Sequence, residues 1–342
     1  MAVGIAKALE DWFAAVKRPM PWRRRPTPYV CWLSEIMMQQ TTYKSVLPYY
    51  ERFLKRFPTV EKLAAAKESE VLKAWEGLGY YARARNLLNA ARMVVRTSGS
   101  TAPAELTGKR SPDRLSKKSS VDHISWPSTS VEWSALPGIG PYTAAALASV
   151  LEGERTPVVD GNVARVFSRV WKLSEDFSKQ PNRAKLAARL QPEIDRCRVP
   201  GDFNQAMMEL GATVCTPTSP NCAACPLAKL CAARKDGAQA DYPAKPRKKA
   251  LPVRQVSAVI VTDEKGRVLL VQNKAGGLLK GLWELPAVEP GEGLTQVFSH
   301  FKLELSTVHA IRSDAEFRDP KSVPLTTATR RALAAYFRGA VS

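Results

Sequence analysis

The sequence lacks any apolar run long enough to cross a bilayer, and acidic residues are few for its length. No apolar stretch approaches the roughly 18 residues that a membrane helix needs, so we expect no membrane span. Asp and Glu number 32 against 51 Lys and Arg, and the formal net charge is +19. This surplus favours a polyanionic partner, namely DNA, RNA or an acidic membrane surface. The 342 residues, 45% of them hydrophobic, suffice for two domains with a core each.

Cysteine is scarce, and four of the six cysteines lie close together, with the spacing Cys215-x6-Cys222-x2-Cys225-x5-Cys231. Such clustering indicates a metal site in a reducing compartment, not a scattered disulfide framework. Four thiolates at this spacing can surround a cubane iron–sulfur cluster. Zinc is the alternative, although short zinc sites usually pair two CxxC knuckles and this segment has one.

Strand-like alternation of apolar and polar residues is absent before residue 250, so we expect the first 230 residues to be helical. The predicted helices cover residues 5–17, 29–57, 60–75 and 82–96, and a rigid basic loop covers 18–28. Pro48 is expected to break or kink the second of these helices. Residues 97–130 are rich in Ser, Pro and Lys and poor in large apolar residues, which predicts a mobile loop.

The pattern changes after a polar, proline-containing linker at 234–252. Two predicted strands, 256–262 and 267–272, flank a hairpin turn. A final helix is expected over 326–337. This part of the chain is therefore predicted to be a small α+β domain.

A glycine-rich turn followed by a helix has the form of a phosphate-binding site. Residues 136–151 read LPGIGPYTAAALASVL, in which Gly138 and Gly140 permit positive φ and Pro141 suits the first helical turn. Such a turn aims backbone N–H groups at one point, although it can equally be a plain connection between helices. Asp160 follows in VVDGNV at 158–163. An Asp before Gly is also common as an Asx turn or a helix cap.

Glu35 stands among apolar residues in the run WLSEIMMQQT at 32–41. Burial raises the pKa of a carboxyl group and allows it to act as a general acid. From the local sequence alone, a solvated Glu on a helix face remains the alternative.

Together the glycine turn, Asp160, the four cysteines and the Glu35 run resemble the MutY-type, A/G-specific adenine DNA glycosylases of the helix-hairpin-helix (endonuclease III) superfamily. The resemblance implies a mainly α catalytic region at 1–233 and a Nudix-like 8-oxoguanine recognition domain at 253–342. Within the first, it implies a six-helix module at about 25–135 and a cluster module from 1–24 and 136–233. It also implies a 4Fe–4S cluster on Cys215, Cys222, Cys225 and Cys231. The expected state is a monomer in the bacterial cytoplasm, at the nucleoid, bound to double-stranded DNA with A:8-oxoguanine or A:G mispairs.

The resemblance also implies roles for individual residues. Glu35 would protonate the departing adenine, and Asp160 would stabilise the oxocarbenium-like sugar, as paired carboxylates do in glycoside hydrolysis. Asn162 would orient the carboxylates or a water molecule. Tyr142 stands where the lyase branch has a Schiff-base lysine, so strong β-lyase activity is not expected. Tyr142 would lie beside Asp160 and help to stabilise the cationic sugar. The adenine pocket would contain Arg18, Met20, Trp22, Arg23, Met38 and Gln205. Gln40 and Tyr80 would enter the duplex, and Gly138 and Gly140 would contact DNA. Phe298, Ser299 and His300 would recognise 8-oxoguanine.

Three other functions stay open, with different support. GLWELP at 281–286 and EPGE at 289–292 resemble the start of a Nudix domain, but no Arg-Glu-x-x-Glu-Glu core follows, so a phosphohydrolase ranks last. An endonuclease III-like glycosylase/lyase for oxidised pyrimidines is opposed by Tyr142 and by the small C-terminal domain. An iron–sulfur DNA-binding or redox-sensing protein leaves Glu35 and Asp160 unexplained.

Overall fold

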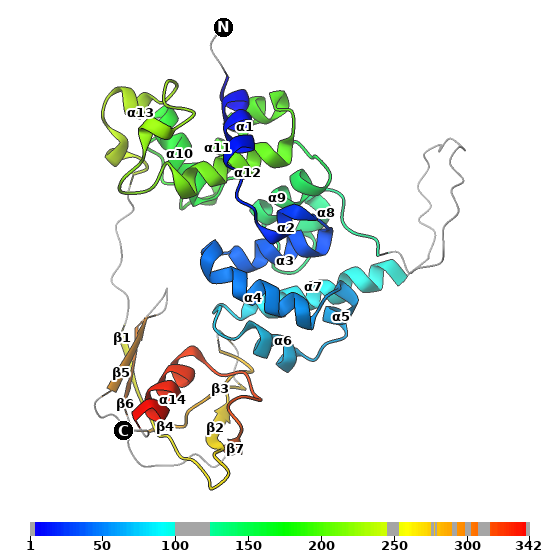
Figure 1. Ribbon diagram of the computed structural model, residues 1–342, viewed down its shortest axis with the longest axis vertical. Coiled ribbons are helices and arrows are strands. Elements are labelled where there is room, and N and C mark those ends of the chain that lie inside the picture. Colours follow the sequence, from blue (N-terminus) through cyan, green and yellow to red (C-terminus); the bar gives the residue numbers. More distant parts are fainter. Residues whose placement is uncertain are drawn as a thin grey trace. The chain divides into compact units, whose positions relative to one another are not determined.

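The computed structural model describes residues 4–99, 124–244, 253–274, 277, 279–288, 293–297, 302–306 and 315–339. The chain groups into two compact units (Figure 1). The first unit comprises Met1–Ile36 and Arg96–Arg247, and the second comprises Met37–Val95 and Lys248–Ser342. The domain limits predicted at 233 and 252 stay predictions. Within the described ranges, no helix has the length and apolarity required to cross a membrane.

The first unit is helical throughout its described part. Its elements are α1 (Ile5–Val16), α2 (Pro21–Arg24), most of α3 (Pro28–Met38), α8 (Ser130–Ser134), α9 (Pro141–Leu151), α10 (Gly161–Trp171), α11 (Gln180–Arg196), α12 (Pro200–Thr213), η1 (Cys222–Ala224), α13 (Ala232–Lys235) and η2 (Gln239–Asp241). In Figure 1, α1 lies against α11 and α12. Phe13 of α1, Phe167 of α10 and Phe203 of α12 are fully buried and belong to one hydrophobic core.

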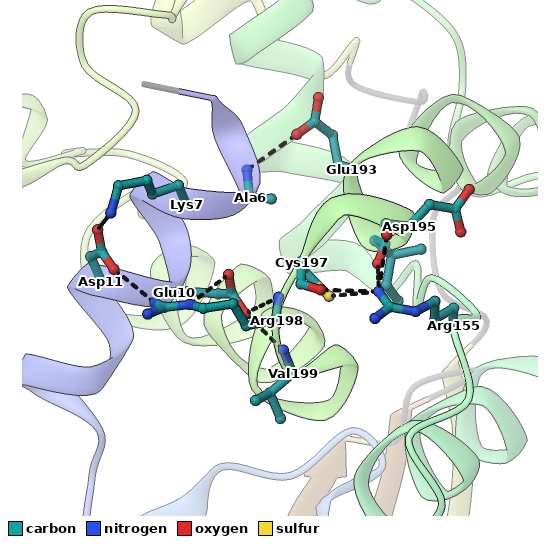
Figure 2. Close-up of polar contacts among 11 residues, drawn as sticks. Ala6, Lys7, Glu10, Asp11, Arg155, Glu193, Asp195, Cys197, Arg198 and Val199 are labelled. Atoms are coloured by element: carbon teal, nitrogen blue, oxygen red, sulfur yellow. Dashed lines mark hydrogen bonds and ion pairs between the residues drawn. The ribbon is translucent and has the colours of Figure 1, made fainter. Parts of the chain in front are cut away.

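A buried carboxylate on α1 holds the start of α12 (Figure 2). The backbone N–H groups of Arg198 and Val199 donate to Glu10 Oε1 at 2.8 and 2.9 Å. Val199 precedes the first residue of α12, and its own side chain does not cap the helix. Glu10 therefore satisfies donors at the positive end of α12, where a negative charge is favourable. This contact fixes α12, which carries the predicted pocket residue Gln205, relative to α1.

The predicted helix over 29–57 is two helices, α3 and α4 (Tyr43–Arg56). Of the predicted break or kink at Pro48, the break is wrong: Pro48 lies inside α4, and the chain turns just before that helix. Gln40 has a φ of +57°, which cannot continue a right-handed helix, and Thr42 is extended. A proline in a helix removes one backbone hydrogen bond, and α4 accommodates that loss.

The predictions for 60–75 and for the loop at 18–28 differ from the structure in detail. The range 60–75 contains two helices, α5 (Val60–Ala64) and α6 (Glu68–Trp75), because the Thr59 side chain caps the first and the chain leaves the helix before Lys67. The range 82–96 is α7 (Ala82–Gly99), as predicted. Within the loop predicted at 18–28, α2 forms one helical turn. Most of the mobile loop predicted at 97–130 lies outside the described residues.

The C-terminal part of the second unit is α+β, as predicted. One sheet has the order β4-β1-β6-β5, in which β1 and β6 are parallel and the other pairs antiparallel; the second is antiparallel with the order β3-β2-β7. The strands are β1 (Val253–Ala258), β2 (Val268–Gln272), β3 (Trp283–Glu284), β4 (Ala287–Val288), β5 (Gly293–Val297), β6 (Lys302–Ser306) and β7 (Glu316–Arg318), and α14 (Thr327–Gly339) follows them. The predicted turn at 263–266 is present, but β1 and β2 belong to different sheets.

Within the second unit, the C-terminal part contacts the α6–α7 hairpin. Lys73 Nζ donates to the carbonyl oxygens of Pro320 and Val323 at 3.1 and 2.8 Å. The Tyr81 hydroxyl donates to the Leu325 carbonyl at 3.3 Å. The loop between α6 and α7 is therefore attached to the segment that leads into α14.

Candidate active site

Glu35, in the middle of α3, faces the second residue of α9. The Tyr142 hydroxyl donates to Glu35 Oε2 at 3.4 Å and contacts Met208 Sδ of α12 at 2.9 Å. Loss of hydration and, to a lesser extent, the Asp160 carboxylate raise the pKa of Glu35 to about 7, against the opposing effects of Tyr142 and Arg23. A carboxyl group with this pKa is half protonated near neutral pH, so it can donate a proton there.

Asp160 directly precedes α10 and caps it. Its Oδ1 accepts the Val163 N–H at 2.7 Å, and its Oδ2 accepts the Asn162 side-chain amide at 3.0 Å. Burial has the larger effect and raises the pKa of Asp160 above its ordinary value, although these hydrogen bonds oppose the shift. The carboxylate also raises the pKa values of Glu35 and Tyr142. Asp160 is therefore both a helix cap and an electrostatic neighbour of the acid.

A chain of hydrogen bonds connects Asp160 to the backbone before the cysteine loop. Arg165 Nη2 donates to Asn162 Oδ1 and to the Gly211 carbonyl, both at 2.8 Å, and its Nε donates to the Cys215 carbonyl at 2.9 Å. A Cβ at Gly211 would come within 2.6 Å of Asn162 Cβ, so the glycine permits the close approach of α10 and α12. Sequence reasoning missed Arg165, although its position three residues after Asn162 places both on one helix face.

Several predicted pocket residues meet around Glu209, a buried residue of α12 that sequence reasoning also missed. Arg18 binds the Glu209 carboxylate with two nitrogens, Nε and Nη2, and Arg23 Nη2 donates to it at 3.3 Å. Arg23 Nε also donates to Gln205 Oε1 at 2.6 Å. Paired guanidinium groups compensate the burial of this carboxylate and orient Gln205.

The remaining pocket and DNA-contact predictions are placed as follows. Met20 and Trp22 are buried, at 3% and 5% exposure, whereas Met38 belongs to the second unit. Gln40 and Tyr80 also lie in the second unit, each with a positive φ. In the glycine turn, Gly138 has a φ of +79°, but Gly140 has an ordinary φ of −87°, so only Gly138 needs the left-handed conformation. Phe298, Ser299 and His300 lie outside the described residues.

The four clustered cysteines line one cavity together with Val166, Arg169, Val170, Asn221 and Gln239. Arg169, which is only 2% exposed, donates to Cys215 Sγ at 3.3 Å and to the carbonyls of Thr216 and Pro217 at 2.7 and 2.9 Å. Among the described residues, no three His, Cys, Asp or Glu side chains form a group able to hold a single metal ion. A cubane cluster would require one thiolate for each of four irons around a cavity, and four cysteines line this one.

Comparisons with solved structures support the fold. The chain superimposes on a thermostable thymine-DNA glycosylase with a TM-score of 0.55 at 24% identity, covering 68% of this chain and 95% of that one. It superimposes on endonuclease III in a non-covalent DNA complex with a TM-score of 0.51 at 20% identity, covering 67% and 94%. Residues 33–192 match the family described as HhH-GPD superfamily base excision DNA repair protein.

Curated relatives resemble most of the chain. It is 36% identical over 342 residues to the adenine DNA glycosylase of Homo sapiens, covering 84% of this chain and 58% of that protein. It is 31% identical over 291 residues to that of Buchnera aphidicola subsp. Acyrthosiphon pisum, covering 85% and 76%. The chain spans 58%, 64% and 47% of the human, rat and Arabidopsis relatives. It therefore belongs to the adenine DNA glycosylase family, within the HhH-GPD superfamily of base excision DNA repair proteins.

Proposed function

We propose that this protein excises adenine mispaired with 8-oxoguanine or guanine in duplex DNA, by monofunctional hydrolysis of the N-glycosidic bond. One observation carries the proposal: Glu35, with a pKa of about 7, lies beside Tyr142 and within the electrostatic influence of Asp160. Enzymes raise the pKa of a Glu into this range when it acts as a general acid at neutral pH. The relatives named adenine DNA glycosylase support adenine as the excised base.

The reaction follows from two carboxyl groups with different protonation. Adenine is flipped out of the duplex, and Glu35 donates its proton to N7 of the base. The C1′–N9 bond breaks, its electron pair leaves with adenine, and positive charge develops on the sugar. Asp160 stabilises that charge, an effect of the kind that contributes about 10²–10³-fold to a rate. Water adds at C1′ and returns a proton to Glu35, which leaves an abasic site and free adenine.

Tyr142 favours hydrolysis over the lyase alternative. A Schiff base with the sugar requires an amine, and a phenol has none. The Tyr142 hydroxyl donates to Glu35 instead, and Asn162 and Arg165 hold Asp160 in place. We therefore assign the catalytic roles to Glu35 and Asp160 and the positioning roles to Tyr142 and Asn162.

DNA contacts are assigned by the same reasoning. The adenine pocket comprises Arg18, Met20, Trp22, Arg23, Met38 and Gln205, the duplex-inserting residues are Gln40 and Tyr80, and the phosphate-contacting turn contains Gly138 and Gly140. An amide side chain such as Gln205 can hydrogen-bond the edge of a flipped base. The net charge of +19 supports a DNA partner because cationic side chains replace the counterions of phosphates.

A 4Fe–4S cluster is proposed for the cysteine cavity. Cys215, Cys222, Cys225 and Cys231 would each bind one iron. When bound, the cluster supplies a covalent crosslink that orders the loop after α12. Arg169 places a positive charge against Cys215 and donates to four carbonyls of the neighbouring backbone, which supports a site built for thiolate charge.

Recognition of the opposite base is proposed for Phe298, Ser299 and His300 in the Nudix-like C-terminal region. 8-Oxoguanine differs from guanine by an N7 hydrogen and a C8 carbonyl. A serine hydroxyl can accept a hydrogen bond from the first and donate one to the second. The chemistry of this short run therefore suits discrimination between the two bases.

The test is a single-turnover assay with enzyme in excess over duplexes that carry adenine opposite 8-oxoguanine, guanine, cytosine or thymine. We expect excision opposite 8-oxoguanine and guanine, and a Ser299→Ala/His300→Ala protein should lose the preference for 8-oxoguanine. High-yield borohydride trapping of a protein–DNA adduct would instead support the lyase alternative. The absence of cleavage on all four duplexes would overturn the proposed function.

A further inference from the structure

Two loops of the second unit contain a residue with left-handed backbone where no glycine stands. Gln40 follows α3 with a φ of +57°, and Tyr80 precedes α7 with a φ of +49°. Lys172 is the one other such residue in the described ranges, and it ends a helix. Bulky side chains adopt this conformation only where the surrounding structure imposes it. Some group must therefore hold the backbone at Gln40 and Tyr80.

Arg83, in the first turn of α7, binds both loops at once. Its Nη1 donates to the carbonyls of Met37 and Gln39 at 3.1 and 2.6 Å. Its Nη2 donates to the carbonyls of Leu78 and Gly79, both at 3.3 Å. One rigid, planar guanidinium therefore spans the two loops, which a lysine ammonium cannot do with the same geometry.

The positions of these carbonyls matter more than their number. Gln39 C=O belongs to the peptide that joins Gln39 to Gln40, and Gly79 C=O belongs to the peptide that joins Gly79 to Tyr80. Because φ describes rotation between that peptide and the residue after it, anchoring the carbonyl restricts the φ of Gln40 and of Tyr80. The Arg83 guanidinium also lies 5.5 Å from the centre of the Tyr80 ring, where cation–π attraction acts on the side chain itself.

Helix stability does not explain an arginine at this position. A cation in the first turn of a helix faces the positive end of the helix dipole, which is unfavourable. Burial is unfavourable too, and it lowers the pKa of Arg83 to about 10, which still leaves the group charged at neutral pH. These costs are compensated by the four carbonyls of the two loops.

We propose that Arg83 is a positioning residue that sets the backbone of Gln40 and Tyr80 together, so that both enter the duplex as one unit. This inference rests on the proposed function, in which these two side chains occupy the space that the flipped adenine leaves. Displacement of either loop disturbs hydrogen bonds of the same guanidinium, so the two insertions are coupled. Arg83 touches neither the base nor the sugar in this account.

The test compares two substrates for Arg83→Lys and for the matched control Arg85→Lys. Arg85 lies two residues further along α7 and pairs with Glu68, the first residue of α6. Single-turnover excision is measured on a fully paired duplex with adenine opposite 8-oxoguanine, and on the same duplex with mismatches beside the adenine, where the base is already unstacked. Arg83→Lys should slow excision about tenfold or more on the first duplex and at most about threefold on the second. Arg85→Lys should leave both rates unchanged.

Each outcome decides the matter. If Arg83→Lys slows excision equally on both duplexes, Arg83 has only a structural role. If it slows excision on neither duplex, Arg83 does not position Gln40 and Tyr80. If the wild-type protein cleaves neither duplex, the proposed function itself has failed. Should Arg83→Lys not fold, Gln40→Ala, Tyr80→Ala and the double variant replace it. Coupled insertion predicts that the double variant loses clearly less than the product of the single losses, and a loss equal to the product would contradict it.

Discussion

Glu35→Gln is expected to abolish excision and, at alkaline pH, to stabilise the fold. The pKa of Glu35 lies at about 7 against an ordinary value of 4.5, because burial and Asp160 disfavour its charged form. The folded protein therefore binds this proton more tightly than the unfolded chain. The contribution to stability is fully present below about pH 4.5, is lost as the pH rises through 7, and then stays constant.

The magnitude follows from the two pKa values. A difference of about 2.5 pH units corresponds to about 3 kcal/mol of unfolding free energy. Glu35→Gln removes the charge, so its unfolding free energy at about pH 8.5 should exceed that of the wild type by up to about 3 kcal/mol. At about pH 5 the difference should be less than about 1 kcal/mol. Below pH 7, where the wild-type acid is protonated, loss of the proton donor should slow excision by about 10²-fold or more.

Two assays measure these effects. Urea denaturation at both pH values gives the difference in unfolding free energy. Single-turnover excision across the neutral range gives the acid profile of the wild type. Because the acid must be protonated, the rate should be highest below pH 7 and should fall about tenfold for each further pH unit above it. Asp11→Asn, on the exposed side of α1, serves as the matched control for carboxylate removal.

Opposite trends would refute this reasoning. A wild-type rate that rises through pH 7 would mean that Glu35 acts as a base or does not take part in the limiting step. A Glu35→Gln protein that is no more stable than the wild type at alkaline pH would mean that the carboxyl is not buried as described. Excision by this variant at the wild-type rate would remove Glu35 from the mechanism.

Two further predictions concern the packing of α10 and the cysteine cavity. Gly211→Ala should lower the unfolding free energy by about 1–3 kcal/mol and slow excision. The new Cβ would lie 2.6 Å from the Asn162 Cβ and would displace the amide that holds Asp160. Urea denaturation measures the change in stability, and single-turnover kinetics measure the change in excision rate. Gly161→Ala, with open space around its Cβ, is the matched control, and a Gly211→Ala protein as stable as this control would contradict the packing argument. The purified protein should contain about four irons per chain, and Cys222→Ser should reduce the iron measured by elemental analysis; stoichiometric zinc without iron would contradict the cluster.

The helices could be predicted from the sequence where their signals are local. Apolar spacing in α1, Pro141 followed by an alanine-rich run in α9, and the pattern of α14 each depend on neighbouring residues. The turn at Gln40 could not be predicted, because its left-handed backbone depends on Arg83, which is 43 positions away in the sequence. Pro48 was the stronger local signal for a break, but the helix continues through it.

In the candidate site, too, some residues could be predicted from the sequence and others could not. Glu35, Tyr142 and Asp160 stand in conspicuous runs, and the structure brings them together. Arg165, Met208 and Glu209 stand in helices without a motif, and only the packing of α12 against its neighbours gives them partners. Sequence reasoning therefore reached the groups with distinctive chemistry and missed the groups that position them.

The central claim is that this protein hydrolyses the adenine N-glycosidic bond and leaves the strand intact. The most direct measurement is mass spectrometry of both products after a single turnover on a duplex with adenine opposite 8-oxoguanine. The account predicts free adenine and an uncleaved strand with one abasic site, and neither product from Glu35→Gln. An unchanged duplex, or a strand cut by β-elimination as adenine is released, would contradict it.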